Sequence, residues 1–447
     1  MKKKSVFGAK KRLWTTCCMM AFGSVAWTFP LKMKDNAILN DSEVQAFLGS
    51  ILNPALRTLP HAPRVKLYVV GNSALNAFAI QEPSIFVFSG LILAADGPGE
   101  VAAVLYHELG HVIGHHALQG LEEMRRTSSQ GFLTLLLGVL ASVVTGSPAP
   151  FMAGMTLGNL NATAFQMSHS RDHECFADRF ALKTLEKLNY PHRCFTDFMQ
   201  KLLRMESMDY PFYLRTHPYI KDRIHMAKTH VRAHSGELPK GLEDQFYRTK
   251  IKLLAFTSPL EHAKEAVEQA KVPEGIKKYG HAIVAFRLGK ARQALERLAS
   301  FQKQYGDSPY IQELKAQILF EAGNTKEALV AINRALHYRP LDGLMGVLKA
   351  QIALENQNAS DVIPLLERLV CSIEGEESAE LWYWLSVAYG RNNQLGRMKI
   401  CMAEQAFAME DFQKAKGCVK DGLKRLSRED PYYQRAKELE CALLDKK

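Results

Sequence analysis

The strongest constraint on the fold is the HExxH pentapeptide at residues 107–111, His-Glu-Leu-Gly-His. Two histidines four residues apart lie about 40° apart around an α-helix, so both imidazoles can bind one metal ion. Glu108 projects beside them and could take a proton from a metal-bound water. A catalytic zinc ion normally takes three protein ligands. The chain must therefore fold to bring a third ligand from elsewhere.

The third ligand is not expected on the same helix. The extended pattern HExxHxxGxxH fails, because Ala117 stands where its last histidine would be. Four further candidates continue the helix and are not expected to return to the metal: His115, His116, Glu122 and Glu123.

The next carboxylates occur only in the segment 171–179, RDHECFADR. Glu174 and Asp178 are one helical turn apart there, on a shared face. This spacing suits a metal ligand together with a carboxylate that orients a ligating histidine.

Three motifs in order are similar to those of a known family: HELGH at 107–111, ExxxD within 171–179, and RTHP at 215–218 followed by KDRI at 221–224. They resemble the gluzincin metallopeptidases related to CAAX-prenyl proteases, and within these the periplasmic branch with C-terminal tetratricopeptide repeats. The likeness runs from about Val65 to the end of the chain. It implies one zinc ion bound by His107, His111 and Glu174, with Glu108 as the general base and Asp178 as the acid that supports a ligand.

The third motif leaves the roles of His217 and Arg223 open. Either side chain could donate a hydrogen bond to the oxyanion of a tetrahedral intermediate. His217 could instead occupy the fourth zinc position as a latch and hold the enzyme latent. The remaining interpretation is an ordinary loop histidine that caps a helix before Pro218.

The region before the HExxH motif reads as a helix followed by a small sheet. We expect a helix at Ala37–Leu56 and strands at Val65–Val70, Ala77–Ile80 and Ser84–Phe88. In zinc peptidases of this architecture an edge strand aligns the substrate by backbone pairing. We expect Ile85–Phe88 either to take that role or to be a half-buried core strand.

Between the two metal-binding segments, Phe132–Val144 is a continuous run of apolar or small residues. It is shorter than the roughly 20 residues that a transmembrane helix needs. Two interpretations remain, a buried core helix and a mobile lid over the cleft that could touch a membrane surface.

The C-terminal part carries an internal repeat. Leu288–Leu295 recurs as Ala322–Leu329, a period of 34 residues. This is the tetratricopeptide period, in which paired helices stack and build a concave binding surface. We expect about four repeats, the middle one degenerate.

The N-terminus resembles a cleavable signal peptide, with basic residues, a short apolar stretch and the ending Ser24–Ala26. This predicts a periplasmic protein. The formal net charge is +11, but residues 1–26 hold six basic residues and no acid, which leaves +5. We therefore expect no nucleic-acid partner. Six cysteines outside this segment permit disulfides of unknown pairing.

The sequence thus predicts a mainly helical α+β chain in four segments: a signal peptide at 1–26, a zincin-type metalloprotease domain with a small sheet at 27–235, a linker with connecting helices at 236–275, and an all-α tetratricopeptide-like solenoid at 276–447. The expected function is that of an exported zinc metalloendopeptidase acting on protein or peptide substrates. The resemblance implies quality control of misassembled outer-membrane proteins, with the repeats docking on the barrel-assembly complex. The alternative is an assembly chaperone with little or latent proteolysis.

Overall fold

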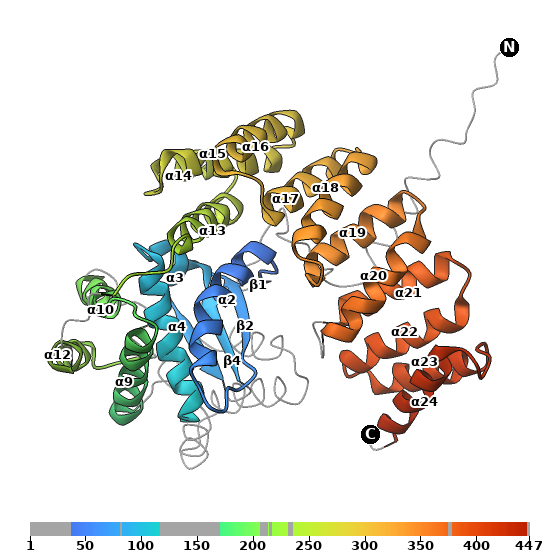
Figure 1. Ribbon diagram of the computed structural model, residues 1–447, viewed down its shortest axis with the longest axis horizontal. Coiled ribbons are helices and arrows are strands. Elements are labelled where there is room, and N and C mark those ends of the chain that lie inside the picture. The colour runs from blue at the N-terminus through green and yellow to red at the C-terminus, as the bar shows by residue number, and fades with distance from the viewer. Residues whose placement is uncertain are drawn as a thin grey trace.

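The computed structural model describes residues 37–80, 83–116, 170–205, 213, 217–230, 236–373 and 378–444. These residues are mostly helical, with one four-stranded sheet near the N-terminus (Figure 1). The signal peptide expected at 1–26 and the apolar run Phe132–Val144 lie outside the described residues. Within the described part of the chain, no helix is long and apolar enough to cross a membrane.

The sheet confirms the three expected strands and adds a short fourth. Its strands are β1 (Ala37–Ile38), β2 (Lys66–Gly71), β3 (Ala77–Ile80) and β4 (Ser84–Phe88), in the order β1-β2-β4-β3. β2 and β4 are parallel, and the other two pairs are antiparallel. Because β4 pairs on both sides, the expectation that Ile85–Phe88 offers a free edge to a substrate is wrong.

Among the described residues, these helices accompany the sheet: α2 (Ser42–Arg57), α3 (Ser89–Ala94), α4 (Pro98–Ile113), α9 (Arg171–Lys187), α10 (Arg193–Met205) and α12 (Ile220–His230). The helix expected from Ala37 begins only at Ser42, because Ala37 and Ile38 pair with β2 as β1. Asp41 caps α2, and its side chain accepts hydrogen bonds from two backbone N–H groups. The small and branched side chains on one face of β3 and β4 pack in the same core as α2 and α4.

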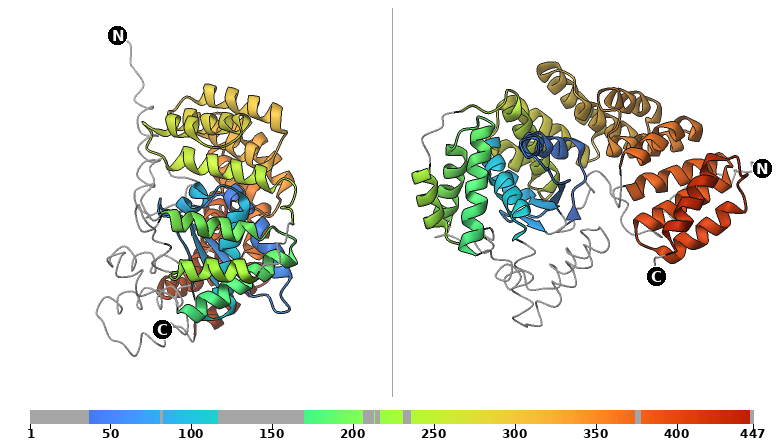
Figure 2. Two further views of the ribbon diagram at one scale, coloured as in Figure 1. Left: turned by 90° about the vertical axis from the view of Figure 1, so that its left-hand side faces the viewer. Right: turned by 60° about the horizontal axis from the view of Figure 1, so that its bottom comes forward.

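The described residues between Leu242 and Ala442 are mostly helical and curve in an arc beside the sheet (Figures 1 and 2). Its helices are α13 (Leu242–Thr257), α14 (Ala263–Gln269), α15 (Glu274–Arg287), α16 (Ala291–Tyr305), α17 (Pro309–Glu321), α18 (Thr325–Tyr338), α19 (Gly343–Glu355), α20 (Ala359–Ser372), α21 (Ala379–Arg391), α22 (Leu395–Ala408), α23 (Phe412–Leu423) and α24 (Pro431–Ala442).

Five turns between consecutive helices in the described part of this arc share one backbone geometry. Each holds a residue with positive φ: Gly289 at 72°, Gly323 at 83°, Gln357 at 62°, Asn393 at 55° and Glu410 at 58°. The first three are 34 residues apart, so the period visible in the sequence continues through the copy that looked degenerate.

Two large hydrophobic clusters hold the molecule together. The first extends from Leu39 to Ile318 and so includes one face of the sheet, α13 and the first repeat helices. The second extends from Ala316 to Leu443. The segment 236–275, expected to be a linker with connecting helices, contributes α13 and α14 to the first cluster.

Candidate metal centre

The HExxH motif lies on the buried helix α4, as its spacing predicts. His107, Glu108 and His111 are each at most 2% exposed. The Nε2 atoms of the two histidines are 3.0 Å apart, and the imidazole rings meet edge to face. Such close nitrogen atoms suit two ligands of one ion.

Glu174 joins them from the first turn of α9. Ser170 caps this helix by accepting a hydrogen bond from the backbone N–H of His173, 3.3 Å away. Glu174 Oε1 lies 3.3 Å from His111 Nε2, and Glu174 Oε2 lies 3.4 Å from His107 Nε2. The two segments that the sequence separates by about sixty residues therefore meet at one point.

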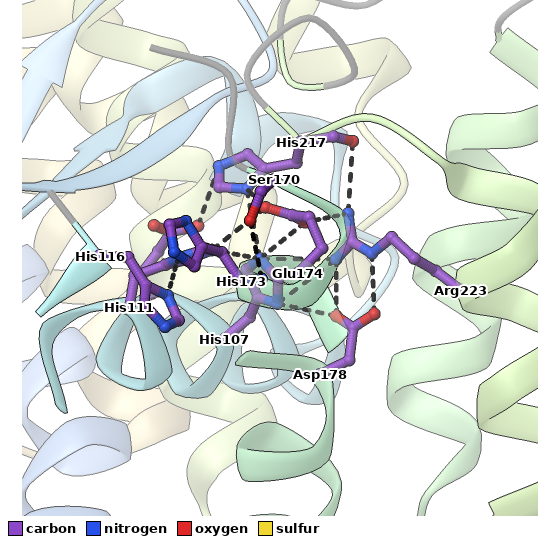
Figure 3. A network of polar contacts seen from close by, with 10 residues as sticks. His107, His111, His116, Ser170, His173, Glu174, Asp178, His217 and Arg223 are labelled. Carbon is purple, nitrogen blue, oxygen red and sulfur yellow. Dashed lines mark hydrogen bonds and ion pairs between the residues drawn. The ribbon is translucent and has the colours of Figure 1, made fainter. Parts of the chain in front are cut away.

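His217 completes a set of four, which Figure 3 shows facing one another. Its Nδ1 atom lies 3.2 Å from His107 Nε2 and 3.1 Å from Glu174 Oε1. One donor atom from each of His107, His111, Glu174 and His217 lies within 4.8 Å of the others. Zinc bonds of about 2.0–2.1 Å in tetrahedral geometry put neighbouring ligand atoms roughly 3.3 Å apart. Taken with Glu174 Oε1, four of the six distances among these donor atoms are 3.0–3.3 Å, a spacing that fits that ion.

Asp178 and Arg223 support the cluster from one side (Figure 3). Asp178 Oδ1 lies 2.8 Å from His107 Nδ1. Arg223 binds Asp178 with two nitrogen atoms, Nε at 2.8 Å and Nη2 at 2.7 Å. Its Nη1 lies 2.8 Å from Glu174 Oε2 and 3.3 Å from the carbonyl oxygen of His217. One guanidinium thus holds parts of three segments in place.

The charges in the cluster balance one another. Burial alone would raise the pKa of Glu174, but Arg223, His217 and His107 together hold it well below its usual value. Burial is likewise outweighed at Asp178, where Arg223 and His107 lower the pKa. Both carboxyl groups are therefore ionised, as metal coordination and imidazole orientation require.

Glu108 differs from these two carboxylates. Among the described residues neither of its oxygens has a hydrogen-bond partner, although the side chain is fully buried. Burial raises its pKa, and His217 offsets this only in part. A buried carboxylate with a raised pKa beside a metal cluster is suited to accept a proton.

His116 enters the cluster against expectation. It was expected to continue away along the helix, but α4 ends at Ile113 and His115 has a φ of 53°. The chain reverses, and His116 Nδ1 comes within 2.9 Å of His111 Nδ1. Burial and His173 lower the pKa of His116 to about 4, so its ring is neutral at neutral pH.

The structure brings all seven site residues expected from the sequence into one cluster: His107, Glu108, His111, Glu174, Asp178, His217 and Arg223. Within the described part of the chain, His116 also reaches the cluster, which the sequence did not predict. Gly114, two residues before it, was the available signal, because glycine often marks the end of a helix.

Comparisons with known proteins agree with this geometry. Residues 39–231 match the model of peptidase family M48. The beta-barrel assembly-enhancing protease of Escherichia coli K12 is 28% identical over 324 residues, which cover 68% of this chain and 63% of that protein. The same protease of Yersinia pestis is 23% identical over 67% of this chain and 63% of its own length. The mitochondrial metalloendopeptidase OMA1 of Arabidopsis thaliana is 27% identical over 158 residues, 35% of this chain and 30% of that protein. The chain thus spans just under two thirds of the length of the two bacterial proteases.

Proposed function

Residues 39–231 form a domain of peptidase family M48, and from this premise we propose that the chain is an exported, zinc-dependent endopeptidase. The observation that carries the proposal is the buried set of three imidazoles and one carboxylate whose donor atoms lie within 4.8 Å of one another, with Glu108 beside it. Imidazole and carboxylate are ligands that zinc prefers.

The reaction proposed for this centre is peptide hydrolysis. A zinc ion held there would lower the pKa of a bound water to about 7 and polarise the scissile carbonyl. Glu108 takes a proton from the attacking water and passes it to the leaving amine. Asp178 accepts the Nδ1 proton of His107 and so turns its Nε2 atom toward the ion.

For Arg223 we propose a positioning role instead of the oxyanion contact considered from the sequence. Its nitrogen atoms already contact Asp178, Glu174 and the carbonyl oxygen of His217. If the guanidinium moved away from these partners, two buried carboxylates would lose their counter-charge, which is energetically unfavourable. The centre therefore keeps Arg223 where it is during the reaction.

The substrates that we propose are unfolded or misassembled outer-membrane proteins in the periplasm. Support comes from two similar bacterial proteins named as beta-barrel assembly-enhancing proteases. The helical arc offers the kind of surface on which repeats hold peptides or docking partners, here the barrel-assembly complex. An assembly chaperone with little proteolysis is the competing function.

The Glu108→Gln variant tests the enzymatic proposal. Glutamine keeps the shape of the side chain but cannot act as a base, so cleavage of an unfolded protein should fall by at least about 100-fold. Zinc content, measured by elemental analysis, should stay at one ion per chain because no ligand is lost. Glu186→Gln, an exposed position on α9, is the matched control. Full cleavage by Glu108→Gln would rule the mechanism out. Full cellular function of a non-cleaving variant would establish the chaperone instead.

We further propose that His217 is a latch. Its Nδ1 atom occupies the fourth corner of the ligand set, where a catalytic site needs a water. Its ring stacks on Tyr213 at 4.4 Å between centroids. In this proposal the structure corresponds to a latent enzyme, and proteolysis requires His217 to move away.

The His217→Ala variant separates the three interpretations of this residue. If one molecule in ten is open at rest, removing the latch should raise the rate of proteolysis by roughly tenfold. A loss of activity with zinc retained would assign His217 to the oxyanion, and an unchanged rate would make it an ordinary loop histidine. His225→Ala, on the exposed side of α12, is the control.

A further inference from the structure

His116 occupies a site built for an imidazole ring at the end of α4 (Figure 3). His173 on α9 stacks on the ring at 4.2 Å between centroids and 12° between planes. Phe176, from the same helix, meets it edge to face at 5.2 Å. The side chain is 4% exposed. The ring is therefore held on two sides by the helix that carries Glu174.

Gly114 makes room for this arrangement. A Cβ atom at that position would lie 2.2 Å from His116 Nε2 and 2.6 Å from its Cε1 atom. The φ of Gly114 is −76°, which any residue can adopt. Glycine is therefore needed at position 114 because the His116 ring fills the space of a side chain, and not because the φ angle requires it.

The contact with His111 has a defined direction. A neutral imidazole that binds a metal through Nε2 carries its proton on Nδ1. His111 Nδ1 therefore donates to His116 Nδ1 across 2.9 Å. The other ligand histidine is held in the same way, because His107 Nδ1 faces Asp178 Oδ1 at 2.8 Å.

We propose that His116 is a positioning residue of the metal centre, which accepts the Nδ1 proton of His111 and keeps its Nε2 atom aimed at the ion. The inference rests on the proposed zinc site. His107 is oriented by a carboxylate and His111 by a second imidazole, so each ligand histidine faces an acceptor of its own. Through its stacking on His173, the same ring also joins the end of α4 to the start of α9.

The test compares variants that keep or lose the acceptor. His116→Phe keeps a flat ring against His173 but removes the nitrogen atom that faces His111 Nδ1. Its zinc affinity, measured in competition with a chromophoric chelator, should fall by about 10- to 100-fold. His116→Asn places an amide oxygen near the position of Nδ1 and should recover affinity to within about threefold of wild type. The absorption spectrum of the cobalt-substituted protein should change in the phenylalanine variant and return in the asparagine variant.

His115→Asn is the matched control, because His115 is exposed and asparagine tolerates its positive φ. Gly114→Ala should weaken zinc binding as His116→Phe does, and should have no effect when His116 is already alanine. The inference would be overturned if His116→Phe bound zinc with wild-type affinity, or if the phenylalanine and asparagine variants lost affinity equally. Neither outcome would contradict the zinc site itself. A wild-type protein that binds no zinc would overturn the proposed function as well.

Discussion

Arg223 neutralises two carboxylates that are both buried, Asp178 and Glu174. Removing one partner of a buried ion pair leaves uncompensated charge and typically costs about 3–5 kcal/mol. We predict a loss of that size in the free energy of unfolding of metal-free Arg223→Met, measured by urea denaturation. Arg179→Met, an exposed arginine on α9, should change it by less than about 0.5 kcal/mol. Equal stability of the two variants would contradict the charge balance described for the centre.

The site residues that could be predicted are those whose spacing is helical. His107 and His111, or Glu174 and Asp178, share a face whatever surrounds them, because the helix period alone places them there. His217 and Arg223 were found only through resemblance, since no local rule brings a loop to a helix. His116 was missed because its position depends on the backbone of His115, and a single positive φ reverses the direction of the chain.

At the scale of elements, the close contact between α4 and α9 determines whether the ligands meet. A Cβ at Gly110 would lie 2.8 Å from Ala177 Cα and 3.1 Å from its carbonyl oxygen, both of which are backbone atoms. Replacing glycine by alanine inside a helix usually stabilises by about 1 kcal/mol. Here we predict the opposite sign, because the two helices must separate.

The expected result for Gly110→Ala is a loss of about 1–3 kcal/mol in the free energy of unfolding. Zinc affinity should fall as well, because α9 carries Glu174 away from α4. Gly97→Ala is the matched control, since a Cβ there meets nothing within 4 Å. Thermal unfolding of the metal-free proteins and chelator competition measure the two effects, and a stabilised Gly110→Ala would show that the contact is not tight.

Element types were predictable and their neighbours were not. Alternation identified the strands, but nothing local indicates that β2 pairs with β4 in parallel and so places β4 inside the sheet. The repeats show the same limit. Glycine at positions 289 and 323 makes the hairpin turn predictable from the sequence. Gln357 and Asn393 adopt the same left-handed backbone conformation, but these residue types do not predict a turn of this kind.

At the scale of the whole molecule, a buried polar cluster joins the start of α2 to the repeats. Lys252 on α13 contacts Asp41 at 2.7 Å and Glu43 at 3.3 Å. Ser42 Oγ donates to Asp342 Oδ1, 2.8 Å away, and lies 3.3 Å from Glu313 Oε1 on α17. These contacts span about three hundred residues of sequence, so we infer that the sheet-containing part and the repeats unfold together.

Glu313 makes this junction sensitive to pH. Burial raises its pKa well above the usual value; Lys252 opposes the shift, and Asp41 and Asp342 add to it. The folded state thus keeps a proton that the unfolded chain releases above about pH 4.5. The contribution of Glu313 to the free energy of unfolding is therefore fully present below that pH. It is lost as the pH rises toward the pKa of Glu313 in the folded protein.

The Glu313→Gln variant should remove the dependence, because an amide has the shape of the protonated acid and no proton to lose. We predict that the free energy of unfolding of the variant exceeds that of wild type by about 1–3 kcal/mol at pH 7.5. This difference should shrink as the pH is lowered toward 4.5, by up to about 1.4 kcal/mol per pH unit. Urea denaturation across that range measures it, with the exposed Glu327→Gln on α18 as the control. A gain that does not vary with pH would mean better packing and not proton release. A loss at pH 7.5 would mean that the ionised carboxylate is the form that binds the two parts of the chain to each other.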